Sequence, residues 1–147
     1  MALGTWGRAQ KIDLLARMPL FSTCSQKELA QVATLTVPAQ FAAGAVLTRQ
    51  GASGGLAFVI ASGRAQVTRG GKRLATLGPG DVVGELSLID GEPRSATVKA
   101  VTDMEVLEIS AEDLRRLLRK APPVVRKLLE ALAERLRHAD RLPVTGL

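Results

Sequence analysis

The sequence predicts an α+β fold in which an antiparallel β-roll, similar to a jelly-roll barrel, is flanked by N-terminal helices and a C-terminal helix pair. Three observations predict it. Apolar residues recur at helical spacing in residues 8–34 and in residues 111–141, whereas residues 35–110 hold short apolar runs between glycine-containing turns. The length of 147 residues suits one domain, so we expect a single domain over residues 1–147.

The N-terminal zone, residues 8–34, predicts two helices. Pro19 ends the first helix, because proline cannot donate the backbone hydrogen bond that a helix interior requires. Ser25 and Glu28 have the spacing of a capping box, which predicts the start of a second helix. The apolar residues at helical spacing in these two segments are Ile12, Leu14, Leu15, Met18, Leu29, Val32 and Ala33.

The central zone, residues 35–110, predicts short antiparallel strands. Turn signals recur along it at about the 8–12-residue spacing of a sandwich or barrel. Gly70 and Gly71 lie between the strand-like segments 65–68 and 74–77, which predicts a hairpin with a primed two-residue turn. Further strands are predicted at residues 96–101 and 105–109.

The C-terminal zone, residues 111–141, predicts a helix pair. Ser110 suits an N-cap, and the prolines at positions 122 and 123 end the first helix and open the second. The predicted buried face of the first helix is formed by Leu114, Leu117 and Leu118. The apolar stripe of the second consists of Val125, Leu128, Leu129, Leu132, Leu136 and Ala139. Such a stripe serves a core or a partner helix, and we expect a homodimer through the helix of residues 122–140.

Composition excludes several classes of site. Cys24 and His138 are the only residues of their types, so an internal disulfide and cysteine-based or histidine-pair metal sites are excluded. One Trp and three Phe are too few for a platform that stacks single-stranded nucleic acid. The formal net charge of +6 indicates no specific partner. Because neither a signal peptide nor a membrane span is evident, we expect a cytoplasmic protein.

Residues 80–98, within the strand zone, are the most informative stretch. Residues 85–89 suit one helical turn that begins after Gly84, and the backbone N–H groups at such a terminus attract anions. Arg94 carries a planar guanidinium that can hold a phosphate with two hydrogen bonds. Glu85, when ionised, only accepts hydrogen bonds, which suits a sugar hydroxyl. Together the two side chains form a pair suited to a nucleotide.

The sequences of residues 84–88, Gly-Glu-Leu-Ser-Leu, and of residues 93–97, Pro-Arg-Ser-Ala-Thr, carry a family resemblance. They resemble the phosphate-binding cassette of the cyclic-nucleotide-binding domain family, which includes bacterial catabolite activator protein and the regulatory subunits of cAMP-dependent protein kinase. The resemblance extends over roughly residues 12–140. Val83 departs from the family pattern, since many members have an aromatic residue there. The resemblance implies the β-roll fold and the binding of a cyclic nucleotide.

The resemblance also implies roles for the matched residues of the cassette. Glu85 would accept a hydrogen bond from the ribose 2′-hydroxyl, and Arg94 would pair with the cyclic phosphate. Ser95 would donate hydrogen bonds to phosphate oxygens. Gly84 and Leu86 would supply backbone contacts.

Four further positions complete the expected site. Ser87 and Ala96 would lie close to the phosphate, Thr97 would begin the next strand near the base, and Asp140 of the last helix would contact the base. The resemblance further implies that Ser at position 95 favours cAMP over cGMP. From their positions in the sequence, the expected apolar wall of the pocket is Val46, Leu47, Val59, Leu77, Val82 and Val83.

These residues predict a regulatory or sensor module that passes ligand occupancy through its C-terminal helix to an unknown protein partner. No nucleophile–base pair or carboxylate cluster lies near the cassette, so we expect no enzyme activity, metal or cofactor. Residues 141–147 are too few for a DNA-reading unit, so we expect no specific DNA binding. The alternative is an interaction module of the same fold, with an idle pocket, that docks a partner through its basic C-terminal face. The presence of both Glu85 and Arg94 favours the sensor.

Overall fold

Two four-stranded antiparallel sheets form the centre of the molecule, seen in a computed structural model that describes residues 6–17, 21, 23–84, 93–123, 125, 127 and 130. The first sheet has the strand order β1-β8-β3-β6 and the second the order β2-β7-β4-β5. The strands are β1 (Val37–Phe41), β2 (Val46–Thr48), β3 (Leu56–Ser62), β4 (Ala65–Arg69), β5 (Lys72–Leu77), β6 (Val82–Val83), β7 (Thr97–Ala100) and β8 (Met104–Ser110). The predicted antiparallel roll is therefore confirmed.

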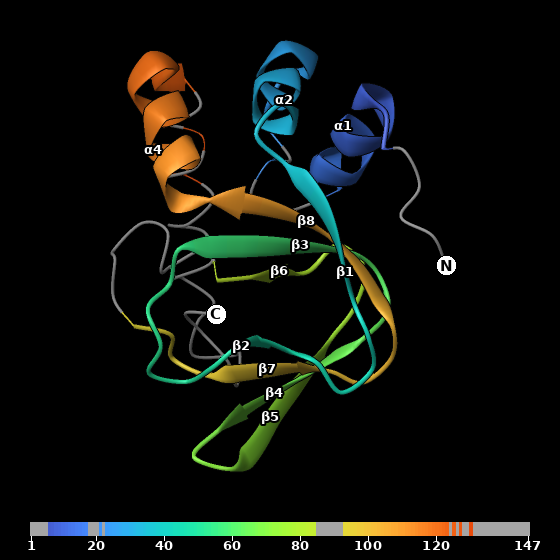
Figure 1. The fold of residues 1–147 in the computed structure, drawn as a ribbon. Helices are drawn as coiled ribbons and strands as arrows, with labels where there is room; N and C mark the ends of the chain where they lie inside the picture. The colour runs from blue at the N-terminus through green and yellow to red at the C-terminus, as the bar shows by residue number, and fades with distance from the viewer. Residues whose placement is uncertain are drawn as a thin grey trace.

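Within the described residues, three helices lie on the outer side of the first sheet, away from the second sheet (Figure 1). They are α1 (Arg8–Ala16), α2 (Gln26–Ala33) and α4 (Ala111–Lys120). Figure 1 shows α2 between α1 and α4, with β8 leading directly into α4. In the part of the chain that the structure describes, no helix has both the length and the apolarity needed to cross a membrane.

Strand β3 is buried on both faces over residues 57–60. Along β3, Ala57 and Val59 belong to the core beneath the helices, whereas Phe58 and Ile60 belong to the core between the sheets. Successive side chains of a strand point to opposite faces, so a strand covered on both sides is apolar at every position. This explains why residues 56–61 form a continuous apolar run rather than an alternating one.

The β4–β5 hairpin has the predicted two-residue turn. Gly70 and Gly71 both have positive φ, 58° and 79°, which is the requirement of a type I′ turn. Arg69 pairs with Lys72 across the turn, and a bulge follows between Val67 and Thr68. Glycine adopts both of these backbone conformations without a steric cost, so the sequence determines the turn locally.

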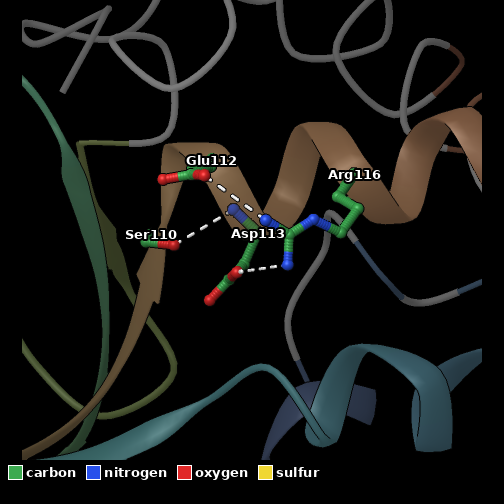
Figure 2. Close-up of polar contacts among 4 residues, drawn as sticks. All are labelled: Ser110, Glu112, Asp113 and Arg116. Atoms are coloured by element: carbon green, nitrogen blue, oxygen red, sulfur yellow. Dashed lines mark hydrogen bonds and ion pairs between the residues drawn. The ribbon is translucent and has the colours of Figure 1, made fainter.

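The predicted helix starts are also confirmed. The Ser25 hydroxyl accepts a hydrogen bond from the Glu28 N–H at 3.2 Å, and the Glu28 carboxylate accepts one from the Ser25 N–H at 2.7 Å. At α4 the Ser110 hydroxyl accepts from the Asp113 N–H at 3.1 Å (Figure 2). These contacts satisfy N–H groups that have no partner within a helix.

The predicted break before the second C-terminal helix is found at Ala121. Its φ of −135° and ψ of 71° leave the helical region, and Pro122 and Pro123 are helical again, as are Val125 and Lys127. Proline is suited to the first turn of a helix, where no backbone N–H is needed. Several residues of the two predicted apolar faces lie outside the described side chains: Leu114, Leu118, Leu128, Leu129, Leu132, Leu136 and Ala139.

Candidate functional site

A cavity of about 570 Å³ opens between the two sheets at one end of the roll. Its lining comes from β2, the following loop, the start of β3 and Arg94. The lining residues within the described ranges are Gly44, Val46, Leu47, Thr48, Arg49, Ala52, Ser53, Gly55, Leu56, Phe58 and Arg94. The volume falls in the range of about 300–1,000 Å³ that is typical of small-molecule sites.

The backbone of Arg94 is fixed by the loop between β2 and β3. The Arg94 N–H donates to the Ala52 carbonyl at 2.9 Å, and the Gly51 N–H donates to the Arg94 carbonyl at the same distance. This reciprocal pair determines where the arginine side chain leaves the chain. Loop residues that the sequence predicts only as a turn therefore position the principal residue of the site.

The Arg94 side chain is buried, with 7% of the residue exposed, although it borders the cavity. Its Nη1 donates to the Gly84 carbonyl at 3.2 Å, and its Nη2 donates to the Leu56 carbonyl. Burying a guanidinium is costly unless hydrogen bonds replace those it loses with water. The two carbonyls replace part of that hydration and fix the orientation of the guanidinium.

Gly84 is required by the position of the Arg94 guanidinium. Its φ is +87°, a conformation that other residues rarely adopt. A Cβ at this position would overlap Arg94 Nη1 and would lie 2.9 Å from Arg94 Cζ and 3.0 Å from the Leu56 carbonyl oxygen. The sequence predicts a backbone contact from Gly84, and the structure adds that only glycine leaves room for the arginine.

Residues 95–97 continue from Arg94 into β7, and each is held by a different neighbour. Arg69 Nε donates to the Ser95 carbonyl at 2.9 Å. The Thr97 hydroxyl accepts from the Gln50 N–H at 2.9 Å, and Thr97 begins β7 as the sequence predicts. Ala96 is buried in the core between the sheets, so its methyl group serves packing.

The structure brings together part of the predicted site. Gly84 and Arg94 are in direct contact at the cavity, and Ser95, Ala96 and Thr97 follow immediately. The other four predicted residues, Glu85, Leu86, Ser87 and Asp140, lie outside the described residues.

The predicted apolar wall is correct in part. Val46 and Leu47 line the cavity, but Val59 and Val82 pack in the core beneath the helices. Leu77 and Val83 belong to the core between the sheets and are not among the lining residues. The prediction for Val59 is wrong by one position along the strand, because successive side chains point to opposite faces of the sheet and the neighbouring residue faces the cavity.

That neighbour, Phe58, is an apolar lining residue that the sequence did not predict, as is Leu56. Phe58 borders the cavity and packs edge-on against Phe41, with ring centroids 5.6 Å apart and planes at 86°. Arg49 was missed as well and brings a second cationic side chain to the lining. A useful signal was the arginine two residues before the glycine-rich turn of residues 51–55.

A second charged contact joins the C-terminal helical residues to α2. Lys127 Nζ lies 2.6 Å from Glu28 Oε1, and both side chains are largely covered, with 23% and 13% exposed. The hydrogen bond from Lys127, followed by that from the Ser25 N–H, lowers the pKa of Glu28 to about 2. Burial raises the pKa of the nearby Cys24 thiol, which fits a packing role rather than a reactive one.

The model of the cyclic nucleotide-binding domain family matches residues 38–121, which include the cavity, Gly84 and Arg94. The chain belongs to the cyclic nucleotide-binding domain family. This confirms the resemblance found in the sequence. The match spans all eight strands apart from the first residue of β1, and it ends at Ala121, where α4 terminates.

Proteins with different names are similar to this chain. The chain is 37% identical to the cyclic AMP receptor protein of Thermus thermophilus, covering 83% of this chain and 59% of the relative. It is 34% identical to a cyclic nucleotide-gated potassium channel of Rhizobium etli, and this match covers 84% of this chain and 34% of the channel. The crystal structure of the N-terminal domain of a Streptomyces coelicolor transcriptional regulator superposes with a TM-score of 0.77 at 33% identity, covering 88% and 93%. The chain thus spans between about a third and three fifths of these two curated relatives.

Proposed function

We propose that this domain binds a cyclic nucleotide in the cavity at Arg94 and acts as a regulatory module. The observation that carries the proposal is the buried Arg94 guanidinium at the cavity wall, oriented by the Gly84 and Leu56 carbonyls. A cyclic phosphate is a monoanion that loses hydration on entering a cavity, so it needs a fixed cation and hydrogen-bond donors. A guanidinium supplies both in one planar group.

The remaining contacts are those that the resemblance implies. Glu85 accepts from the ribose 2′-hydroxyl, Ser95 donates to the phosphate, and Leu86 and Ser87 lie beside it. Asp140 contacts the base. We propose that the module acts by binding alone, without metal, cofactor or catalytic step.

We propose that cAMP is preferred over cGMP. The support is Ser at position 95 and the 37% identity to a protein whose name is cyclic AMP receptor protein. The preference should be small in free energy, since both nucleotides offer the same ring phosphate and ribose to Arg94 and Glu85.

Calorimetric titration with cAMP and cGMP tests the proposal. The wild-type chain should bind cAMP at micromolar concentration or better. Removing one partner of a desolvated charge pair costs about 2–5 kcal/mol, so Arg94→Ala should weaken binding by roughly 30-fold or more. Arg94→Lys should recover only part of the loss, because an ammonium lacks the planar fork.

Arg73→Ala is the matched control, since Arg73 is an exposed arginine on β5 away from the cavity lining. It should leave the affinity unchanged. Circular dichroism should show that each variant is folded. Failure of the wild-type chain to bind either nucleotide at micromolar concentration would defeat the proposal and favour the interaction module with an idle pocket.

We further propose that occupancy is transmitted through the C-terminal helix, which we also expect to form a homodimer contact. The support is the Glu28–Lys127 pair, which ties helical residue 127 to the first turn of α2. If the C-terminal helix has two positions relative to α2, a ligand shifts the balance between them only by binding one position more tightly than the other. Hydrogen exchange of residues 121–130 should therefore change on addition of cAMP, and less so in Glu28→Gln. Identical exchange with and without cAMP would contradict transmission by this route.

A further inference from the structure

A second concave surface lies on the helix side of the molecule, separate from the nucleotide cavity. It has a volume of about 460 Å³ and is lined by residues of α2 and α4, together with Arg8 of α1. Its described lining residues are Arg8, Lys27, Ala30, Gln31, Thr34, Leu35, Asp113, Arg116, Leu117 and Lys120. None of them lines the cavity at Arg94. We call this surface the helix groove.

The helix groove contains apolar side chains among basic ones. Ala30 is buried, and Leu35 and Leu117 are half-buried, so apolar surface is available at the base of the groove. The basic residues Arg8, Lys27, Arg116 and Lys120 are all exposed. An apolar floor with a charged rim is typical of a protein interaction site rather than of a solvated face.

The charge of the groove is strongly positive. Its described lining has four basic residues and one acidic residue, Asp113. Arg116 is already engaged with Asp113 at 3.7 Å and with Glu112 at 3.3 Å (Figure 2). Lys27 and Lys120, on opposite helices, have no carboxylate within the described lining other than Asp113. The groove therefore favours an acidic occupant.

The dimensions suit a short helix. The lining residues of α4 run from Asp113 to Lys120, which at a rise of 1.5 Å per residue span about 10 Å, or about two helical turns. A helix of this length presents apolar residues at i, i+3, i+4 and i+7 to a groove and leaves the flanking positions for charged contacts. A second copy of this chain is disfavoured as the occupant of the groove, because its amphipathic helix α4 has four basic and two acidic residues and therefore offers no acidic face.

We propose that the helix groove binds an acidic amphipathic helix of a partner protein. The apolar face of that helix packs on Ala30, Leu35 and Leu117, and its Glu and Asp side chains face Lys27 and Lys120. The complementary charges select the partner and speed the encounter, while the apolar contact supplies the affinity. This docking surface shares no described lining residue with the cavity at Arg94, so the domain has a contact with another protein that is separate from the proposed nucleotide site.

The test uses a fluorescein-labelled peptide of about fourteen residues, long enough for about three to four turns, with Leu on one helical face and Glu elsewhere. Fluorescence anisotropy should show binding at about 50 mM salt that weakens at about 300 mM salt, because screening acts on the exposed rim. A peptide with Gln in place of Glu, and another with Ser in place of Leu, should each bind at least tenfold more weakly.

Variants of the groove locate the contact. Lys27→Glu and Lys120→Glu should each weaken the Glu peptide about tenfold, as should Gln31→Trp, which fills the groove from an exposed position without changing its charge. Lys72→Glu on β5 is the matched control for net charge and should bind as wild type does. Arg94→Ala should also bind the peptide normally, so this proposal and the proposed nucleotide site fail separately.

Three outcomes would overturn the proposal. The first is a loss with Lys72→Glu equal to that with Lys27→Glu, which would mean attraction by net charge alone. The second is equal binding of all three peptides, or no binding of the Glu peptide. The third is groove-dependent binding of anionic phosphatidylserine vesicles or duplex DNA in place of the peptide, which would make the occupant a different class of macromolecule.

Discussion

Apolar residues are buried on both faces of the first sheet, but those on one face serve only the core, whereas some on the other face also border the cavity. On the helix side, Val59 packs with residues of α1 and α2, and its only described role is in the core. On the inner side, the adjacent Phe58 packs in the core between the sheets and also borders the cavity. A substitution at Val59 is therefore expected to change stability alone, whereas one at Phe58 is expected to change both stability and the shape of the cavity.

The charged groups on the two sides differ in a similar way. On the helix side, the Glu28 carboxylate meets the opposite charge of Lys127 and joins two helical segments. On the cavity side, the Arg94 guanidinium is oriented by the carbonyls of Gly84 and Leu56. Mutations should show that the first contact controls stability and helix position, whereas the second controls ligand affinity.

The largest effect is expected from Gly84→Ala, which acts on both stability and binding. The added Cβ would be strained at φ +87° and would displace the Arg94 guanidinium. Strain and overpacking together should cost about 2–4 kcal/mol of unfolding free energy. Because Arg94 moves, cAMP binding should fall as far as in Arg94→Ala. Chemical denaturation and calorimetric titration measure the two effects.

Gly78→Ala is the control for this prediction. An added Cβ at Gly78 meets nothing within 4 Å, and its φ is not positive. Its stability should change by less than about 1 kcal/mol. If Gly84→Ala bound cAMP with wild-type affinity, Arg94 could not be the phosphate clamp in the position described.

A smaller effect is expected from truncating one side chain on each face. Val59→Ala removes part of a residue that is 1% exposed and should cost about 2 kcal/mol of unfolding free energy, while nucleotide affinity stays unchanged. Leu47→Ala, at the cavity, should cost less than about 1 kcal/mol in stability but weaken cAMP binding several-fold, because it removes apolar contact with the ligand. If Val59→Ala and Leu47→Ala weakened cAMP binding equally, the helix side and the cavity side would not differ in their roles as described.

Local patterns predicted most of the fold. The Gly70-Gly71 turn, the Ser25–Glu28 capping box and the Ser110 cap each depend on residues a few positions apart, and all three are found as expected. Sequence periodicity failed at Val59 and Val82, because a strand that is apolar on both faces gives no indication of which face a given residue joins.

For the site, the sequence predicted the central residues but not the contacts that position them. A motif of short range identified Gly84 and Arg94 as its centre, but their contact depends on the approach of the Leu56 carbonyl, which lies far away in the sequence. The same is true of the backbone clamp on Arg94 by Gly51 and Ala52 and of the Phe58 wall. Such contacts follow from strand pairing across the roll, and residue spacing alone does not reveal them.

A pH-dependent effect is expected on the helix side, from Glu28. Its pKa is about 2 in the folded chain against an ordinary value of 4.5, so the unfolded chain takes up a proton first as the pH falls. The stabilisation is therefore fully present above pH 4.5 and is lost between pH 4.5 and about 2. Urea unfolding at several pH values should show the difference between wild type and Glu28→Gln shrinking over this interval.

Lys127→Gln is the companion variant, because it removes the largest cause of the lowered pKa. In the Lys127→Gln background, the difference in unfolding free energy between Glu28 and Glu28→Gln should change less between pH 5 and about 2 than it does in the wild-type background. The hydrogen bond from the Ser25 N–H to Glu28 stays in place. A difference between wild type and Glu28→Gln that stayed constant from pH 5 to about 2 would mean that Glu28 acts through packing and not through its charge.

The smallest effect is expected from Arg69→Gln, on the cavity side. Arg69 is exposed, and its Nε holds the Ser95 carbonyl at 2.9 Å, one residue from Arg94. Losing a single exposed hydrogen bond should cost about 0.5–1 kcal/mol, which appears as a two- to fivefold weaker affinity for cAMP, with little change in melting temperature. Arg73→Gln, on the facing strand of the same hairpin, removes an equal charge without touching Ser95 and should leave the affinity as it is. Equal weakening in both variants would assign the effect to net charge; weakening in Arg69→Gln alone would show that the second sheet positions the residue next to Arg94.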